Sequence, residues 1–195
     1  MQLLDILANL PTIETERLLL RKITLNDASD MFEYASNPEV SEYTMWSTHV
    51  SIEDTKYFLK SLTKMYKKRE LVDWGIVHKA EKKFIGTCGF VEWSMTHSRG
   101  ELGYALSGRY WGEGYMSEAV NAVIEFGFRE MLLNRIAARC EVNNIASARV
   151  MEKVGMQLEG ILRQQLFVKG RYWDLKIYSI LREEFFDDIV VVESN

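Results

Sequence analysis

The residues of this chain that could most directly do chemistry form the stretch Arg109-Tyr110-Trp111-Gly112-Glu113-Gly114-Tyr115-Met116-Ser117. A short apolar run, 101–106, precedes it and is typical of a strand. In the segment that follows, about 114–133, apolar residues recur at three- and four-residue steps, as in a helix. Glycines at such a junction let a ligand approach the main chain, and the first N–H groups of a helix have no internal partner. A strand, a glycine turn and a helix N-terminus together predict an anion site, most often for phosphate.

Two common phosphate motifs do not fit this stretch. A Walker loop ends in Gly-Lys-Ser/Thr, whereas Gly114 is followed by Tyr115 and Met116. The dinucleotide fingerprint needs a third glycine where this chain has Ser117, and it normally opens a βαβ unit rather than lying past the middle of a chain. The remaining pattern, Arg-x-x-Gly-x-Gly, resembles the pyrophosphate loop of the GCN5-related N-acetyltransferases (the GNAT family). The alternative is a glycine turn that only connects two elements.

The flanking sequence predicts the elements that must position this loop. A capping-box pattern at Ser51 to Asp54 starts one helix, Pro38 is expected to stop an earlier one near Asn37, and Gly155 is expected to cap a later one. Helices are expected over about 26–37, 52–70, 114–133 and 145–154, and strands over 15–22, 72–78, 83–93, 101–106, 135–142, 156–167 and 173–182. This order predicts a single α/β domain with a mixed, mostly antiparallel sheet of about seven strands flanked by helices.

The composition is that of one soluble globular domain. The chain has 195 residues, of which 47% are hydrophobic and 27% charged. A net charge of −4 argues against a nucleic-acid partner. No apolar run reaches membrane-spanning length, and Met1 to Leu10 lacks the basic lead and cleavage site of a signal peptide. Cys88 and Cys140 lie in strand-like runs and are expected to be buried thiols. We therefore expect a cytoplasmic protein without a membrane partner.

Three further stretches resemble the GNAT family. Asn144-Ile145-Ala146-Ser147, leading into 149–156, is similar to the family's later motif, Asn-x-x-Ser followed by a short helix ending in Glu-Lys-x-Gly. Residues 15–21 resemble the opening strand of the branch that contains the ribosomal-protein N-terminal acetyltransferases (RimJ/RimL-like), and 159–163 with 178–181 resemble its C-terminal hairpin. The resemblance covers 12–186, the expected extent of the domain. It implies a sheet splayed at the cofactor strand, acetyl-CoA as co-substrate and no metal.

The resemblance also implies which residues bind acetyl-CoA. The pantetheine arm is expected to pair with the main chain near Ala105, Leu106 and Ser107. Asn144 is the family position whose side chain steadies the pantetheine amides, and the alternative for it is a helix cap. The pyrophosphate is expected on the N–H groups between Arg109 and Ser117, a stretch that contributes Trp111, Gly112, Glu113, Gly114, Tyr115 and Met116.

The implied chemistry is direct attack of an amine on the thioester carbonyl. A backbone N–H near Leu106 is then the expected donor to the developing oxyanion. Glu101, Glu92 and Glu141 are candidate bases for the amine. Glu101 is preferred because it lies on the cofactor strand, where a carboxylate near the cleft is a usual family base. The alternative for Glu101 is a solvated glutamate at a strand edge.

The leaving thiolate needs a proton, and here the chain departs from the larger family. Many members carry a tyrosine seven positions after the asparagine, but this chain has Met151, which cannot donate a proton. Ser147 lies one helical turn earlier, and its hydroxyl can hydrogen-bond a thiolate. We take Ser147 as the candidate, with stabilisation rather than full acid catalysis as its role. The alternative is that Ser147 only caps its helix.

The acceptor is expected to be a protein N-terminal amine, by resemblance to the branch. A small-molecule amine, such as a polyamine, an amino acid or an antibiotic, is the alternative within enzymes. A non-catalytic acyl-CoA-binding module would fit the loss of the tyrosine, whereas a nucleotide hydrolase would need the missing Walker residues. The branch also suggests a homodimer. Five aromatic residues in or beside predicted loops are candidate acceptor contacts: Tyr43, Trp46, Trp93, Tyr172 and Trp173.

Overall fold

The computed structural model describes residue 6 and residues 8–192, so most of the segment Met1–Leu10 that we discussed for a signal peptide lies outside the described residues. The strands are β1 (Ile13–Glu14), β2 (Leu18–Arg21), β3 (Val72–His78), β4 (Lys83–Ser94), β5 (Arg99–Leu106), β6 (Arg135–Glu141), β7 (Gln157–Val168) and β8 (Arg171–Leu181). The helices are α2 (Ala28–Ala35), α3 (Pro38–Ser41), α4 (Ile52–Lys68), α5 (Tyr115–Arg129), α6 (Ile145–Lys153) and α7 (Arg182–Val192), with 3₁₀ turns at η1 (Leu25–Asp27) and η2 (Gly108–Tyr110).

All of these strands form one sheet, in the order β1-β2-β3-β4-β5-β6-β8-β7. Neighbouring strands are antiparallel except β5 and β6, which are parallel. The expected mixed, mostly antiparallel sheet flanked by helices is therefore confirmed. The described part of the sheet has eight strands rather than about seven, because Ile13 and Glu14 pair with Leu20 and Leu19 as an added edge strand.

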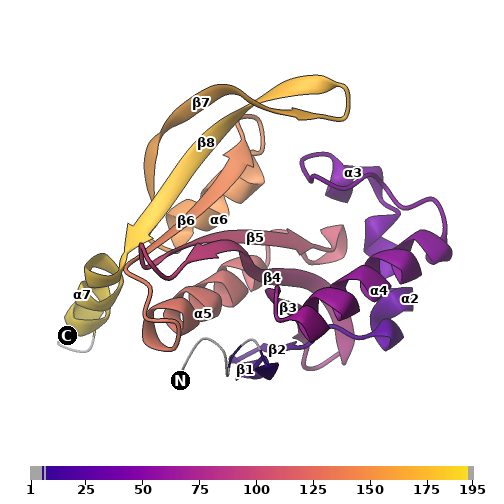
Figure 1. The fold of residues 1–195 in the computed structure, drawn as a ribbon, viewed down its shortest axis with the longest axis horizontal. Coiled ribbons are helices and arrows are strands. Elements are labelled where there is room, and N and C mark those ends of the chain that lie inside the picture. Colours follow the sequence, from indigo (N-terminus) through magenta and orange to yellow (C-terminus); the bar gives the residue numbers. More distant parts are fainter. Residues whose placement is uncertain (1–5, 7, 193–195) are drawn as a thin grey trace.

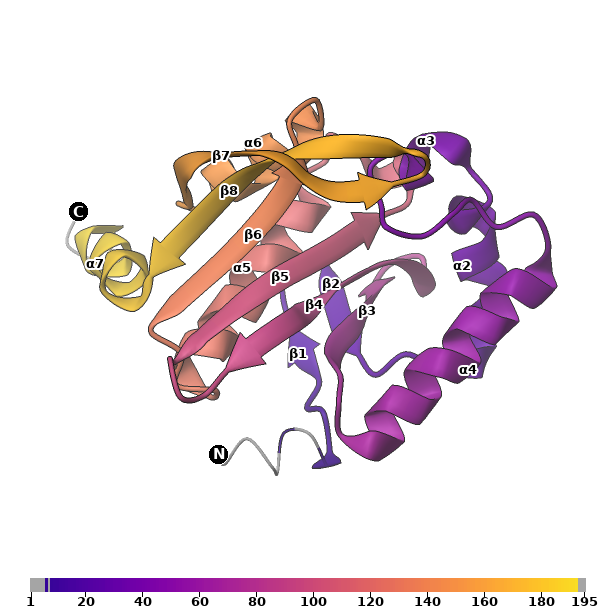
Figure 2. The ribbon, with the colours of Figure 1, turned by 45° about the horizontal axis from the view of Figure 1, so that its top comes forward.

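Helices cover the two faces of the sheet (Figures 1 and 2). Consecutive residues of a strand point to opposite faces, and on β3 the indole of Trp74 meets Phe126 of α5, with ring centroids 5.1 Å apart. The space beside its neighbour Gly75 is filled by Phe84, which stacks on Tyr34 of α2. Helix α5 thus covers one face, and α2 packs on the other.

The sheet opens between its two parallel strands. Pairing of β5 with β6 is limited to Arg99–Leu102 against Arg135–Ala138. Strand β5 continues to Leu106 and β6 to Glu141, so their C-terminal ends are not paired with each other. The splay expected at the cofactor strand is therefore present.

Local sequence signals account for most helix starts, but several observed bounds differ from the expected ones. Helix α5 ends at Arg129 rather than near Leu133. Ser51 and Asp54 form the expected capping box at the start of α4. The expected helix to Asn37 ends earlier, at Ala35, and Pro38 starts α3 instead of only stopping a helix; proline suits a first helical turn, where its missing N–H has no partner. The first strand is shorter than 15–22, and α7 was not expected. No helix in the described ranges is both long and apolar enough to cross a membrane.

Candidate functional site

The glycine loop joins β5 to α5 as the sequence predicted. Gly112 and Gly114 have φ of +82° and +81°, in the left-handed region that residues with a Cβ adopt at a cost. Gly114 is the N-cap of α5, and the first intrahelical bond runs from the Glu118 N–H to the Gly114 carbonyl. The N–H groups of the helix's first turn, at 115–117, therefore remain available to a ligand.

Two cations from distant parts of the chain flank this helix start. A Cβ placed on Gly114 would lie 3.5 Å from Arg17 Nη2 and 3.5 Å from Lys153 Nζ. Arg17 is held there by its Nε, 2.6 Å from Glu118 Oε2, and by its Nη1, which donates to the Glu113 carbonyl at 2.9 Å. A helix N-terminus with two added positive charges suits a pyrophosphate. Sequence reasoning missed both cations, although each lies inside a stretch quoted for the family resemblance.

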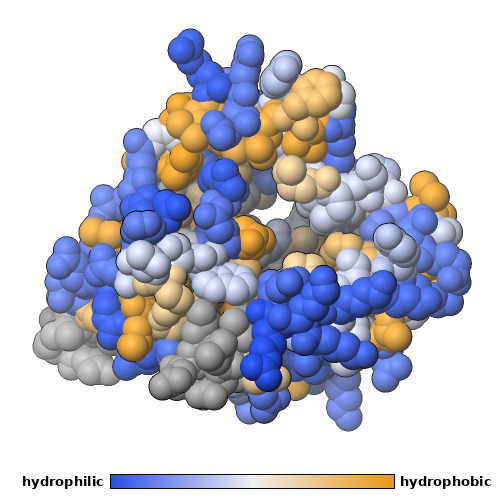
Figure 3. Space-filling model, viewed as in Figure 1, coloured by the Kyte–Doolittle hydropathy of each residue, from blue (hydrophilic) through white to orange (hydrophobic). Residues whose placement is uncertain are grey.

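A cleft of about 1290 Å³ runs from this loop into the gap between β5 and β6 and on over the α2 face of the sheet. Figure 3 shows the surface hollowed beneath the β7–β8 hairpin. The predicted cofactor and catalytic residues that line the cleft are Glu101, Ala105, Leu106, Trp111, Gly112, Gly114, Tyr115, Met116, Ser117, Asn144 and Ser147.

Three predicted cofactor residues do not line the cleft. The Arg109 side chain turns instead to the β3–β4 connection, where its Nη2 lies 3.2 Å from Glu81. Ser107 is buried, and its N–H donates to the Ile85 carbonyl of β4 at 2.8 Å. Glu113 contributes through its carbonyl, which holds Arg17.

The register of β4 and β5 decides which main-chain groups face the gap. Because the Ser107 N–H bonds to β4 and backbone groups alternate in direction along a strand, those of Ala105 also face β4. The main-chain groups of Tyr104 and Leu106 face the unpaired edge of β5 instead. The Leu106 carbonyl accepts from Trp111 Nε1 at 2.9 Å, which leaves the Leu106 N–H directed into the gap. This is the residue that we expected to donate to the oxyanion.

The three candidate bases differ in their surroundings. Glu101 lies 2.7 Å from Arg139 Nε, and burial raises the pKa of its carboxyl, with Arg139 opposing that rise. Glu92 is more exposed and 3.8 Å from Arg99. Glu141 is buried, accepts two hydrogen bonds from Asn143 and lies 3.5 Å from Arg171. A raised pKa in a cleft suits proton uptake, so Glu101 remains the preferred candidate of the three.

The hydroxyl of Ser147 contacts a residue that the sequence did not single out. Asn144 Oδ1 accepts from the Ser147 N–H at 3.0 Å, so the helix-cap interpretation of Asn144 describes its side chain in this structure. Ser147 Oγ lies 2.9 Å from the hydroxyl of Tyr104, which reaches across the gap from β5. Met151 is fully buried in the core. The hydroxyl of Tyr104, on strand β5, thus contacts Ser147 in a chain that lacks the tyrosine of the family's helix. No local sequence pattern could have predicted this contact, because the two residues are far apart in the sequence.

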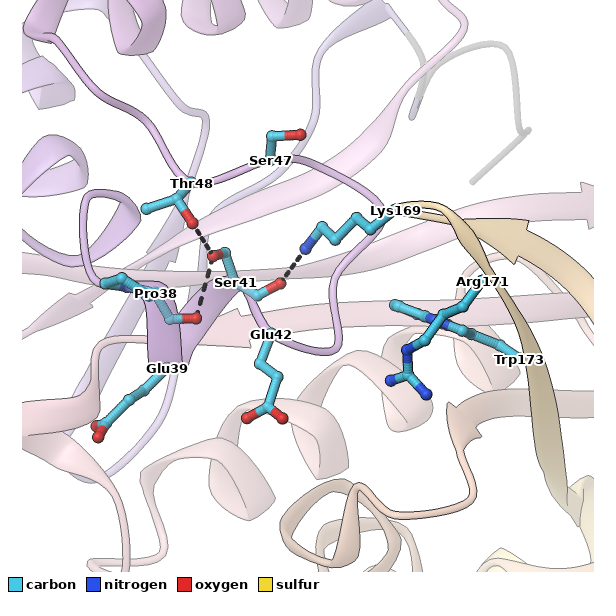
Figure 4. Close-up of a pocket in the computed structure, with 9 residues that line it drawn as sticks. All are labelled: Pro38, Glu39, Ser41, Glu42, Ser47, Thr48, Lys169, Arg171 and Trp173. Atoms are coloured by element: carbon cyan, nitrogen blue, oxygen red, sulfur yellow. Dashed lines mark hydrogen bonds between the residues drawn. The ribbon is translucent and has the colours of Figure 1, made fainter.

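The tip of the β7–β8 hairpin meets α3 beside the cleft, at a smaller pocket that is drawn in Figure 4. Lys169 at the hairpin tip donates to the Ser41 carbonyl, and Ser41 Oγ lies 2.6 Å from Thr48 Oγ1. Of the five aromatic candidates, Tyr43, Trp46 and Trp173 line the cleft, whereas Trp93 and Tyr172 do not. Trp173 is buried, and its indole N–H has no hydrogen-bond partner among the described residues.

The comparisons with known proteins agree with this geometry. Residues 17–157 match the model of the acetyltransferase (GNAT) domain. The chain belongs to the GNAT family. The uncharacterized N-acetyltransferase YoaA of Bacillus subtilis is 37% identical over 172 residues, which are 88% of this chain and 97% of that protein.

Solved structures show the same relationship. An acetyltransferase of the GNAT family from Bacillus anthracis has a TM-score of 0.79 and 33% identity, covering 89% of this chain and 99% of its own. A ribosomal-protein-S5-alanine acetyltransferase from Vibrio fischeri has a TM-score of 0.76 and 27% identity, covering 90% and 98%. The protein is therefore an N-acetyltransferase of this fold. Within the described ranges, no group of three or more His, Cys, Asp or Glu side chains could hold a metal ion.

Proposed function

We propose that this N-acetyltransferase transfers the acetyl group of acetyl-CoA to the α-amine of a protein N-terminus, by direct attack. One observation carries the proposal: the cleft runs without interruption from the glycine loop into the gap between β5 and β6 and beyond it. A pyrophosphate on the α5 N-terminus would let the pantetheine arm follow the free edge of β5 into that gap. A ribosomal L7/L12 acetyltransferase of the same fold, with a TM-score of 0.76, was solved in complex with coenzyme A.

Four groups of this chain take part in the transfer: three side chains and one main-chain N–H. Glu101 lies five residues from Leu106 on β5, about 17 Å at about 3.4 Å per residue, so it receives the proton of the amine through intervening water molecules rather than directly. The Leu106 N–H hydrogen-bonds the oxyanion. The hydroxyls of Tyr104 and Ser147, 2.9 Å apart, stabilise the leaving thiolate. Burial raises the pKa of Tyr104 well above its usual range, which favours hydrogen-bond donation over complete proton transfer.

The free-energy cost of deprotonating the attacking amine favours an α-amine as acceptor. An α-amine titrates near 7.7–8.0, so its neutral form costs about 1 kcal/mol at pH 7, whereas a lysine near 10.4 costs about 4.6 kcal/mol. A single carboxylate that is already ion-paired, as Glu101 is with Arg139, is a modest base. The S5-alanine acetyltransferase among the similar structures supports the same acceptor class.

A thiol-release assay with acetyl-CoA tests the proposal. We expect turnover with short peptides that have a free N-terminus and none when that N-terminus is blocked. Turnover on small amines alone would keep the mechanism and replace the acceptor, in line with the spermidine N(1)-acetyltransferase of Vibrio cholerae, which is 26% identical over 110 residues. Tight coenzyme A binding without turnover on any amine would contradict the enzymatic proposal.

A further inference from the structure

A row of three register partners crosses three strands in the sheet beneath the cleft. Asp73 on β3 is the register partner of Gly89 on β4, and Gly89 is the partner of Gly103 on β5. Register partners in adjacent strands place their side chains on the same face. The row meets β5 next to Leu102, the last residue paired with β6. It therefore leads from Asp73 to the point where the gap opens.

The Asp73 carboxylate lies along this row. A Cβ on Gly89 would be 2.4 Å from both Asp73 Cα and the Val72 carbonyl oxygen and 2.6 Å from Asp73 Oδ1, so the main chain of β3 and the Asp73 carboxylate together fill the space beside Gly89. At the next position, a Cβ on Gly103 would meet Val91 Cγ1 at 2.6 Å. With strands about 4.8 Å apart and about 3.4 Å per residue along each strand, the carboxylate is on the order of 10 Å from the Leu106 N–H. That separation is too long for Asp73 to take a proton directly from the attacking amine.

Among the described residues, Asp73 differs from the other strand carboxylates of the cleft in having no cation partner. Glu92, Glu101 and Glu141 each lie within 4 Å of an arginine. No basic side chain pairs with Asp73 in the described part of the chain, and burial raises its pKa to about 7, opposed only by the Trp74 N–H. The titratable groups that interact with it are the phenols of Tyr34 and Tyr66 and the thiol of Cys88, which are neutral at pH 7 and whose pKa values are also raised.

The lining of the cleft that contains this carboxylate has other features that suit a cation. Trp46 and Phe58 line the cleft, and His49 lies between them, with ring centroids 5.5 and 6.0 Å away. Aromatic faces attract ammonium groups. The lining includes three Lys or Arg side chains and six acidic ones, namely Glu39, Glu42, Asp73, Glu92, Glu101 and Glu141.

We propose that Asp73 binds a second cationic group of the acceptor, an ammonium held on the order of 10 Å from the amine that is acetylated. This inference rests on the proposed acetyl transfer and deepens it by naming a dicationic acceptor class. The required chemistry is the same in a peptide with a lysine close to its free N-terminus and in a linear diamine.

Steady-state acetylation separates these two sources. One arm compares peptides that carry lysine or norleucine at the second or third position. The other compares linear diamines of increasing length with monoamines of the same length. We expect the second charge to raise kcat/KM at least tenfold in one arm, mainly through KM, with an optimum at one spacing. No preference for the second charge in either arm, with normal turnover, would overturn the inference and leave the proposed function intact.

Two variants assign the preference to this residue. D73N should abolish the preference for a second positive charge on the acceptor. E39Q, which removes one charge from the lining of the same cleft, should retain that preference. Equal preference in wild-type protein and D73N would overturn the inference. The wild-type comparison stands even if D73N does not fold. Absence of turnover with every acceptor, with acetyl-CoA still bound, would overturn the proposed function and this inference with it.

Discussion

Alanine substitutions at three glycines separate backbone strain from cofactor binding. Gly112, Gly114 and Gly170 have φ of +82°, +81° and +80°. A Cβ would meet nothing within 4 Å at Gly112 or Gly170, and only the ends of two flexible side chains, at 3.5 Å, at Gly114. The strain is therefore the same at all three positions, but Gly170 lies in the β7–β8 turn, away from the loop.

The expected magnitudes differ between stability and binding. A residue with a Cβ in the left-handed region costs about 1–2 kcal/mol, so each variant should unfold about 2–8 °C lower than the wild type. A methyl group on Gly112 or Gly114 also intrudes where the main chain would meet the pyrophosphate. Loss of one hydrogen bond to a charged group costs about 1.5–3 kcal/mol, which corresponds to about a ten- to hundredfold weaker Kd.

Thermal unfolding and calorimetric titration with coenzyme A measure the two quantities on the same samples. We expect G112A, G114A and G170A to lose similar stability, and only G112A and G114A to lose affinity. If G112A and G114A bound coenzyme A as tightly as the control G170A, the loop would be only a connection between β5 and α5. The assignment of the pyrophosphate site would then be wrong.

Two further predictions concern residues that only the structure brings together. Y104F and S147A should each lower kcat about tenfold or more, the value of one hydrogen bond to a charged group, with little change in acetyl-CoA affinity. Y178F, which removes a hydroxyl outside the cleft, is the control, and an equal loss in that variant would refute a role in the transfer. Hydrogen bonds, above all to Thr15 and Arg17, outweigh burial and lower the pKa of Glu118. The stabilisation that Glu118 contributes is therefore present above its unfolded pKa near 4.3 and is lost as pH falls through the folded pKa. E118Q should thus make the unfolding free energy fall less steeply between about pH 5 and 3 than in the wild type. An unchanged slope would contradict this.

Local patterns in the sequence predicted the parts of the site that depend on a few consecutive residues. The left-handed glycines before α5 and the capping box of α4 are set by steric and hydrogen-bond requirements within about four residues. The strand–loop–helix junction followed from these signals. The same reasoning placed the asparagine and serine at the start of α6. The sequence pattern also predicted a mixed sheet, although the short edge strand β1 was too brief to produce an alternation.

Other features were decided by contacts between distant residues. Arg17 reaches the start of α5 through Glu118, 101 positions away, and the Tyr104 hydroxyl meets Ser147, 43 positions away. The register of β3, β4 and β5 places Asp73 in one row with Gly89 and Gly103, and its carboxylate lies against Gly89.

Side-chain alternation in a strand has a period of two, so a shift of one residue in pairing would turn each of these groups to the other face. By itself the sequence thus determined the loop, the family and the cofactor strand. The tertiary structure decided which cations flank the loop, which hydroxyl meets Ser147 and which carboxylate of the cleft has no cation partner among the described residues. These features depend on strand register and packing rather than on neighbours along the chain.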